Sequence, residues 1–383
     1  MGSILLLFFV SFCFGITDFE DFEREFLKEY QNYKESVLLE FEEYKKIVRE
    51  EFEKYKRDIV KSWGEYEATD KKTWVEYSGD YKLKKVFNFE TGELRIESLT
   101  PLSEKEFEEH IRSFIEEDKN TAFMKQKPLK NIENRLKNFK NVKKGKIPKE
   151  KILAPVIMGK KQYSEEELKK AINDLLRKGE FYKRKLRNGK TSYGFKVKIS
   201  KKLYIMAKKY EPYVEREAKK RNLRESLIFA IIHTESSFNP FATSPVPAYG
   251  LMQIVPTTGG IDATKIIFGK PVILSPSYLY NAENNITVGS AYLYLLYYVY
   301  FKDVKDPLSR LYCSIAAYNT GPGNVARAFT GTRNLRKAIR IINTMTHDEV
   351  YRTLSRNLPY YETKLYLKKV IARIGLYKTF EYK

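Results

Sequence analysis

The chain has 383 residues, of which 43% are hydrophobic and 14% aromatic. This length predicts two or three domains at about 150 residues each, and the apolar content excludes wholesale disorder. The 70 Lys and Arg residues outnumber the 49 Asp and Glu residues, and a net charge of +21 predicts an anionic partner such as nucleic acid, a lipid surface or a cell-wall polymer. The three histidines and two cysteines lie far apart in the sequence, which disfavours a zinc site, a Cys/His nucleophile pair and a disulfide framework, so we expect no metal or other cofactor.

Residues 1–15 have the features of a secretory signal peptide. The apolar run from Ile4 to Phe14 is too short to span a bilayer but suits the core of such a signal, although no Lys or Arg precedes it. Acylation of Cys13 is disfavoured, because that processing requires a small residue at the position of Phe12. We therefore expect simple cleavage and export, which leaves Cys313 as the one cysteine of the mature chain.

Residues 16–65 predict one long amphipathic helix. Apolar residues recur at spacings of three, four and four, and this eleven-residue period keeps the stripe on one side of a nearly straight helix. Thr17 and Glu20 offer a capping box at its start, and Gly64 offers a stop. The stripe from Phe19 to Trp63 must be covered, either by the protein's own domains or by a second copy or another partner. The sequence favours neither alternative.

Residues 66–200 predict a small α+β domain. The stretch from Lys72 to Ser98 alternates as strands do, with a hairpin turn at Thr91 and Gly92. Two helices, near 103–117 and 164–178, and a strand near 191–199 complete it. The lysine-rich segment from Lys125 to Lys161 has little periodicity and predicts an exposed, loop-rich region.

Residues 201–383 predict an all-helical domain. Its expected helices lie near 203–220, 224–236, 284–301, 308–319, 333–343 and 358–378. The helix ending near Glu235 is strongly apolar, so this carboxyl should lie among apolar groups beside a helix C-terminus. Both conditions disfavour ionisation and suit a general acid. Taken alone, Glu235 would more simply be an ordinary exposed helix residue.

Several separated motifs favour a functional role for Glu235 over an ordinary exposed position. The stretch starting at Glu235 reads ESSFNPFATSPVPAYGLMQIVP, and it is followed by Asn285-Ile286, by Ala317-Tyr318-Asn319 and by Glu362-Thr363 with Tyr366. In this order the motifs resemble the SLT domain of lytic murein transglycosylases, glycoside hydrolase family 23. The stretch INTMTHDEVYRTL, from Ile342 to Leu354, is similar to the membrane-bound lytic murein transglycosylase C branch in particular.

The resemblance implies a lysozyme-like helical fold that cleaves the β-1,4 bond between N-acetylmuramic acid and N-acetylglucosamine and leaves 1,6-anhydromuramoyl ends. It implies Glu235 as the single catalytic residue, first acid and then base. The positions implied for substrate binding are Ser244, Gly250, Leu251, Met252, Gln253, Tyr318, Asn319, Glu362 and Tyr366. The implied partner is the glycan strand of peptidoglycan, and the implied location is the periplasm, with association with the outer membrane left open.

The absence of a second acid near Glu235 agrees with this chemistry. Conventional glycosidases need two carboxylates, yet no Asp or Glu occurs between Phe238 and Ile261. One alternative is a lysozyme-type hydrolase on the same fold, and another is a non-catalytic wall-binding scaffold built on the long helix. A nucleic-acid binder rests on charge alone and conflicts with the export signal, so no nucleic-acid partner is expected.

Overall fold

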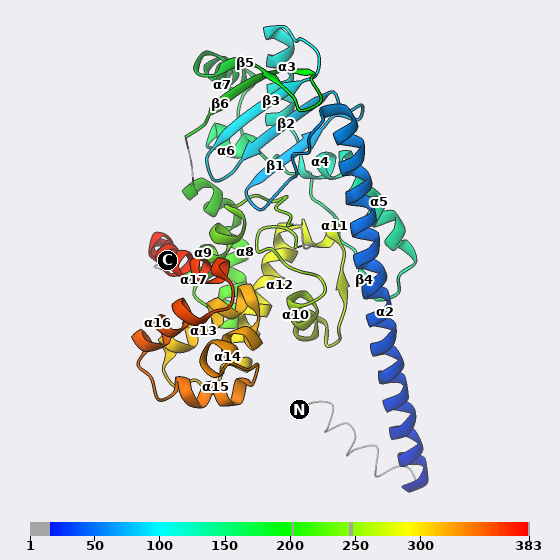
Figure 1. The fold of residues 1–383 in the computed structure, drawn as a ribbon, viewed down its shortest axis with the longest axis vertical. Coiled ribbons are helices and arrows are strands. Elements are labelled where there is room, and N and C mark those ends of the chain that lie inside the picture. The colour runs from blue at the N-terminus through cyan, green and yellow to red at the C-terminus, as the bar shows by residue number, and fades with distance from the viewer. Residues whose placement is uncertain (1–15, 201–202, 245–247, 382–383) are drawn as a thin grey trace.

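The computed structural model describes residues 16–200, 203–244 and 248–381, with side chains from Ser36 onward except at position 38. The predicted signal peptide, with Cys13 and Phe12, lies outside the described residues. A five-stranded sheet region and a larger helical region lie end to end, and one long helix runs alongside both (Figure 1). The α+β class is confirmed. The exact division at residue 200 stays a prediction, and the chain passes from sheet to helices after Lys198.

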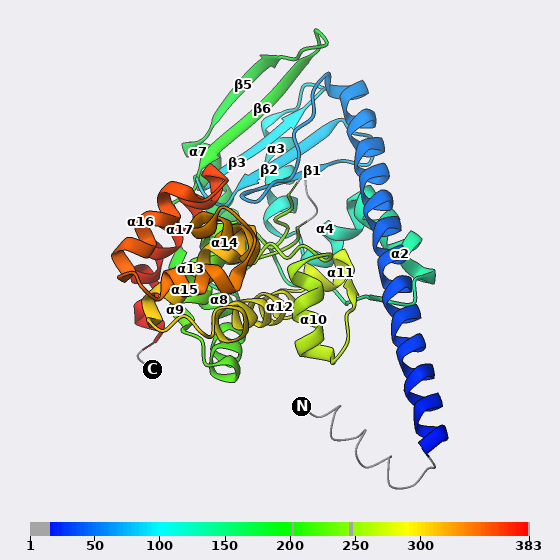
Figure 2. The same ribbon diagram turned by 60° about the horizontal axis from the view of Figure 1, so that its bottom comes forward.

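The long helix α2 (Ile16–Trp63) has 48 residues and ends where the sequence predicts. The next residue, Gly64, has a left-handed φ of 71°, and its N–H donates to the Val60 carbonyl oxygen at 2.7 Å. Stripe residues in the described half are buried against the protein itself: Val37, Tyr44, Val48, Ile59 and Trp63. The chain's own domains therefore cover the stripe from residue 36 onward, whereas the rest of α2 extends beyond the body of the molecule (Figures 1 and 2). Self-association through that part stays a prediction.

The sheet is antiparallel throughout, in the order β1-β2-β3-β6-β5. Its strands are β1 (Thr73–Tyr77), β2 (Leu83–Asn88), β3 (Glu93–Ser98), β5 (Glu180–Lys185) and β6 (Thr191–Lys198). The predicted hairpin joins β2 to β3, with Gly92 at a φ of 78°. Helices α3 (Glu104–Ile115) and α7 (Glu165–Lys178) begin with capping boxes and pack on β3 and β6.

The prediction of an exposed, loop-rich segment from Lys125 to Lys161 is wrong for residues 127–138 and 154–158, which are helical, whereas residues 144–153 contain no helix or strand, as expected. The segment contains α5 (Lys127–Arg135), a 3-10 turn (Leu136–Asn138), the short strand β4 (Val142–Lys143) and α6 (Ala154–Met158), and it follows α4 (Lys119–Lys125). Leu129, Ile132 and Leu136 are fully buried, and α5 packs against α2. These elements are too short to give a clear periodicity, and packing stabilises them: α5 on α2, and α6 on α7 and α8.

The helical region surrounds one buried helix, α9 (Glu225–Ser236). The other elements are α8 (Leu203–Arg221), α10 (Gly259–Phe268), β7 (Ile273–Leu274), α11 (Pro276–Leu279), α12 (Ala282–Leu295), a π-helical turn (Leu296–Tyr300), α13 (Pro307–Thr320), α14 (Pro322–Thr330), α15 (Leu335–Ile342), α16 (His347–Asn357), α17 (Tyr361–Ile374) and a 3-10 helix (Gly375–Phe380). All six predicted helices are present, whereas α10, α11, α14 and α16 were not predicted. In the described part of the chain, every helix is too short or too polar to cross a bilayer.

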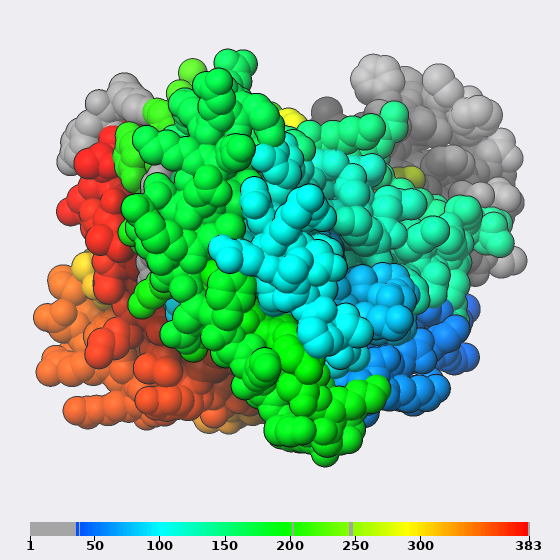
Figure 3. Space-filling model, turned by 90° about the horizontal axis from the view of Figure 1, so that it is seen from above, coloured from blue at the N-terminus to red at the C-terminus, as the bar shows by residue number. Residues whose placement is uncertain are grey.

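The two regions are joined by direct packing. The Trp74 ring of β1 lies 4.6 Å from the Phe114 ring of α3 and 5.7 Å from the Phe241 ring of the helical region, measured between centroids. Strand β4 also pairs with β7, which continues the junction on the α2 side. Seen from the sheet end, the green surface of the sheet region borders the orange and red surface of the C-terminal helices (Figure 3), and Arg373 of α17 pairs with Glu90 of the sheet region.

We expect Trp74→Ala to destabilise the whole molecule. Removing a fully buried indole from this junction should cost about 3–5 kcal/mol and lower the Tm by roughly 10 °C in differential scanning calorimetry. Met124→Ala, at a half-exposed position of α4, is the control and should shift the Tm by much less. Equal Tm values for the two variants would contradict the importance of this contact.

Candidate active site

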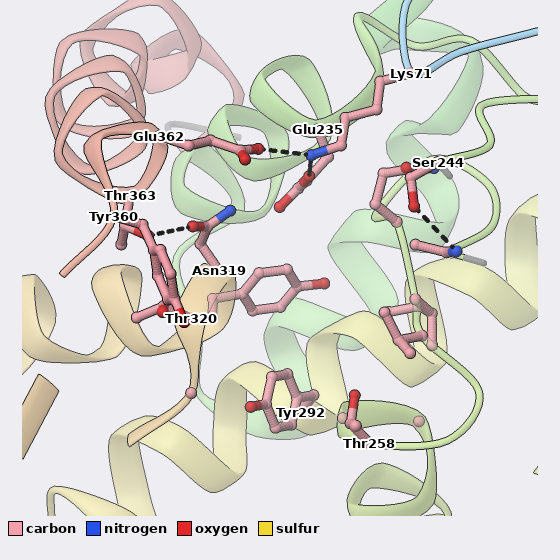
Figure 4. Close-up of a pocket in the computed structure, with 18 of the residues that line it drawn as sticks. Lys71, Glu235, Ser244, Thr258, Tyr292, Asn319, Thr320, Tyr360, Glu362 and Thr363 are labelled. Carbon is pink, nitrogen blue, oxygen red and sulfur yellow. Dashed lines mark hydrogen bonds and ion pairs between the residues drawn. The ribbon is translucent and has the colours of Figure 1, made fainter. Parts of the chain in front are cut away.

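A cleft of about 970 Å³ opens where the sheet region meets the helical region. Its lining comes from the loop 70–72 before β1, from Glu235, from residues 243–244, 248, 253–255 and 258–260, from Tyr292, and from the helix ends near 318–324 and 360–363. Segments far apart in the sequence therefore share one cavity (Figure 4). Its volume lies at the upper end of the range of about 300–1,000 Å³ that is typical of ligand pockets.

Helix α9 presents Glu235 to this cleft. The helix is apolar and almost fully buried. Its last residue is Ser236, and the next residue, Ser237, has a left-handed φ of 49° that ends the helix. Glu235 is only 4% exposed, as the sequence predicts for a carboxyl on such a helix. Burial raises the pKa of Glu235, and Glu362 adds to this, whereas Lys71, Tyr366 and Lys72 act in the opposite direction. The net shift is upward, which favours the protonated form that a general acid needs.

Lys71 is the site residue that sequence reasoning missed. Its ammonium lies 3.8 Å from Glu235 Oε2 and 3.1 Å from Glu362 Oε1, between the two carboxyl groups (Figure 4). Burial lowers the pKa of Lys71, but the two carboxylates outweigh burial and the net shift is upward. Nothing in the local sequence marks this lysine, because it precedes a strand in the other region of the chain.

Lys72 stabilises the C-terminal end of helix α9. Its Nζ donates to the carbonyl oxygens of His233 and Thr234 at 2.9 and 2.8 Å. These groups belong to the last turn of α9, where the His233 carbonyl oxygen also accepts from the Ser237 N–H at 3.1 Å. Arg373 donates to the His233 carbonyl as well, at 3.1 Å. Burial lowers the pKa of Lys72 to about 7, and the charge of Arg373 contributes.

The loop 249–254 is held by Asn285. The Asn285 amide nitrogen donates to the carbonyl oxygens of Tyr249 and Leu279 at 2.8 and 2.9 Å, and its oxygen accepts from the Met252 N–H at 2.8 Å. Gly250 adopts a φ of 76°, and a Cβ there would lie 2.5 Å from both the Asn285 amide and the Leu279 carbonyl oxygen. Glycine is therefore required at this position.

The four residues Gly250, Leu251, Met252 and Gln253 do not share one environment. Gln253 lines the cleft, and its Oε1 is buried without a hydrogen-bond partner in the structure. Leu251 and Met252 are buried in the core instead, and neither they nor Gly250 belong to the described lining of the cleft. The expectation that all four residues contact substrate is corrected for Gly250, Leu251 and Met252. The turn at Gly250 directs the side chains of Leu251 and Met252 into the core, where Met252 packs on Gly289 of α12.

The remaining predicted residues lie around Glu235. Ser244, Tyr318, Asn319 and Glu362 line the cleft, whereas Tyr366 is buried beside the Glu235 carboxyl and influences its pKa. The Tyr318 hydroxyl donates to the Met252 carbonyl oxygen at 3.0 Å. The Asn319 side-chain amide oxygen accepts from the Thr363 hydroxyl at 2.7 Å, which connects α13 to α17. The Ser244 hydroxyl accepts from the Ala248 N–H at 3.3 Å.

No group of three or more His, Cys, Asp or Glu residues suited to a metal ion is found among the residues for which the structure gives positions. The cleft instead combines one buried carboxyl with hydroxyl, amide and aromatic side chains. Such a lining suits a sugar, because hydroxyl and amide groups bond to sugar hydroxyls and aromatic rings pack on sugar faces.

We expect Gly250→Ala to distort this loop. The left-handed φ alone costs about 1–2 kcal/mol, and the close approach to Asn285 and Leu279 should add about 1–3 kcal/mol of overpacking. Gly331→Ala is a matched control, because Gly331 has a similar φ of 70° with open space where the Cβ would lie. Urea unfolding should show the larger loss for Gly250→Ala, and equal losses would refute a steric requirement at this position.

Comparisons with known proteins agree with this site. A family model described as the transglycosylase SLT domain matches residues 212–341. Proteins named membrane-bound lytic murein transglycosylase C from Yersinia pestis (strain Pestoides F) and Yersinia pseudotuberculosis are 46% identical over 164 residues, which is 43% of this chain and 45% of each relative. The chain thus spans less than half the length of these relatives.

Solved structures give similar partial matches. An inactive variant of the lytic transglycosylase Slt from Pseudomonas aeruginosa is 33% identical, with a TM-score of 0.34 over 44% of this chain and 24% of that one. The 70 kDa soluble lytic transglycosylase from Escherichia coli is 29% identical, with a TM-score of 0.34 over 45% of this chain and 25% of that one. Residues 212–341 thus match the transglycosylase SLT domain model, and part of the chain is similar to the Yersinia proteins.

Proposed function

We propose that this chain is a peptidoglycan lytic transglycosylase with Glu235 as its single acid and base. The observation that carries the proposal is the burial of Glu235. Of the three carboxylates among the described residues of the cleft, Asp70 and Glu362 are exposed, Glu362 with 72% of its side chain, and only Glu235 is buried. A protonated carboxyl in an apolar setting, open to a long cleft, suits proton donation to a glycosidic oxygen.

The proposed reaction uses Glu235 twice. Its carboxyl gives a proton to the glycosidic oxygen as the bond from that oxygen to the anomeric carbon of the muramoyl residue breaks. The 6-hydroxyl oxygen of the same sugar then bonds to the anomeric carbon, and its proton returns to the Glu235 carboxylate. No water is consumed, and the products are a 1,6-anhydromuramoyl end and a free 4-hydroxyl.

The other two carboxylates in the cleft are poorly placed for a conventional two-carboxylate mechanism. Asp70 Oδ1 accepts from the backbone N–H groups of Lys72 and Thr73, both at 2.7 Å, so it stabilises its own turn. Glu362 pairs with Lys71 and is mostly exposed. Neither is a free, buried nucleophile, which supports attack by the substrate's own 6-hydroxyl.

Polar side chains of the cleft wall would hold the glycan. The unpartnered Gln253 Oε1 can accept from a sugar hydroxyl or N-acetyl N–H, since burying it without a partner costs free energy. We assign substrate contacts also to Ser244, Tyr318, Asn319 and Glu362, and a supporting contact with Glu235 to Tyr366. The net charge of +21 would hold the protein on a wall that is anionic through its stem-peptide carboxylates.

For location, we propose export to the periplasm with attachment to a membrane. The predicted signal peptide supports export, and the Yersinia relatives are named membrane-bound. Because the large size of Phe12 disfavours acylation of Cys13, we assign the attachment to no particular residue.

Glu235→Gln tests the function directly. Incubated with purified peptidoglycan, the unsubstituted protein should release muropeptides with anhydro ends, one water lighter than reducing ends by mass spectrometry. Replacing the acid by an amide should lower the release about 10²–10⁴-fold. Glu215→Gln, on the exposed face of α8, is the control and should retain full activity.

Three other outcomes would contradict the proposal, each in a different way. Reducing ends made by the unsubstituted protein would show a lysozyme-type hydrolase on this fold. Binding to the wall without release of muropeptides, by either protein, would show a non-catalytic scaffold. Equal release by Glu235→Gln would refute the assignment of the acid.

The pH dependence of the reaction should reflect the raised pKa of Glu235. The acid must be protonated in the free enzyme, so kcat/KM should fall as the pH rises through this pKa. Because burial outweighs the charge of Lys71, the alkaline limb should lie above the ordinary glutamic acid value of 4.5. Initial rates across a pH series measure it, and a limb at or below 4.5 would contradict the proposal.

A further inference from the structure

Lys71 forms ion pairs with two carboxyl groups of the cleft, those of Glu235 and Glu362. Lys71 lies outside residues 212–341, yet its ammonium is one of the nearest charges to the Glu235 carboxyl, 3.8 Å from Oε2. Glu362, also outside that range, holds the ammonium at 3.1 Å from the opposite side. A residue of the sheet region is therefore part of the catalytic cleft (Figure 4).

The backbone around Lys71 is fixed from several directions. The Asp70 N–H donates to the Thr73 carbonyl oxygen at 2.9 Å, and the Asp70 carbonyl oxygen accepts from the Thr243 N–H at 3.3 Å. Lys72, the next residue, is tied to the last turn of α9 through two hydrogen bonds. The loop that carries Lys71 is thus attached to the same helix that carries Glu235, which holds the Lys71 backbone close to that helix.

We propose that Lys71 is a positioning residue for Glu235, held in place by Glu362, and that it stabilises the carboxylate that remains after the first proton transfer. The inference rests on the proposed function and deepens it. Burial favours the protonated acid before the reaction, but the same burial would make the carboxylate costly once the proton has gone. The Lys71 ammonium reduces that cost at the moment when the carboxylate must persist and then accept a proton from the 6-hydroxyl.

The charges and titratable groups around Glu235 agree with this division of roles. The loop 70–72 provides two cations, Lys71 and Lys72, and both lower the pKa of Glu235. Helix α17 provides Glu362, which raises it, and Tyr366, which lowers it. Tyr318 of α13 lies near the same carboxyl, and burial together with that carboxyl raises the pKa of the Tyr318 phenol. Lys71 is the largest of the influences that oppose burial.

The test uses the full chain and compares Lys71→Met with Lys71→Arg. Methionine keeps most of the side-chain length without the charge, and arginine restores the charge. For Lys71→Met we expect kcat to fall about tenfold, with KM within twofold of the original value, and the alkaline limb of kcat/KM to move to higher pH. Arginine should restore most of kcat and the original limb. Lys82→Met removes an exposed lysine of the same region and should change neither quantity.

Glu362→Gln gives a second readout with the opposite sign. Removing this negative charge should lower the pKa of Glu235 and move the alkaline limb to lower pH, because Glu362 raises that pKa. A residue that only stabilised the fold would not produce opposite shifts. Thermal unfolding of each variant shows that it is folded before its kinetics are compared.

Two outcomes would overturn the proposal. A rise in KM at constant kcat would make Lys71 a substrate-binding group, and an unchanged alkaline limb would show that it does not act on Glu235. Direct titration of Glu235 by carbon-13 NMR of the side-chain carboxyl separates this inference from the proposed function. A higher pKa of Glu235 in Lys71→Met would support positioning even if no anhydro product is formed, and an unchanged pKa would refute it.

Discussion

The burial of one carboxyl group is the constraint on which the rest of this structure depends. Glu235 lies at the end of an apolar helix with 4% of its surface exposed, where an isolated carboxylate would be strongly disfavoured. The surrounding contacts offset that cost in two ways. Lys71 places a positive charge near the carboxyl, and Lys72 and Arg373 satisfy carbonyl oxygens of the same helix end. The acid is therefore held in a state from which it can both lose and regain a proton.

This arrangement makes the sheet region part of the site and not a separate appendage. The loop 70–72 reaches the cleft from the start of β1, and Trp74 in that strand packs on Phe241 of the helical region. The long helix α2 supports the junction, since its buried Tyr44 lies beside Tyr249 in the loop that Asn285 holds. Movement of the sheet region relative to the helical region would change the surroundings of Glu235 directly.

Elements with strong local signals could be predicted from the sequence. The eleven-residue period with Gly64 defines α2, and turn chemistry at Gly92 defines the β2–β3 hairpin. The helices within residues 125–161 could not be predicted, because they are short and acquire apolar partners only in the tertiary structure, α5 against α2 and α6 against α7 and α8. Strand β5 was missed as well, since its residues are mostly exposed and it pairs only at the sheet edge with β6.

The sequence by itself identified the candidate acid, since the motifs that begin at Glu235 resemble the SLT domain, whereas the local pattern of its helix alone would leave an ordinary exposed glutamate as the simpler interpretation. It also identified Ser244, Gln253, Tyr318, Asn319 and Glu362, which the structure brings together in one cleft. Only the tertiary structure decided that Leu251 and Met252 face the core while Gln253 faces the cleft, because the turn at Gly250 sets those directions. It alone placed Lys71 beside Glu235 and Glu362. Such a contact joins residues more than 160 and 290 positions apart in the chain, and their proximity depends on how the sheet and helical regions pack.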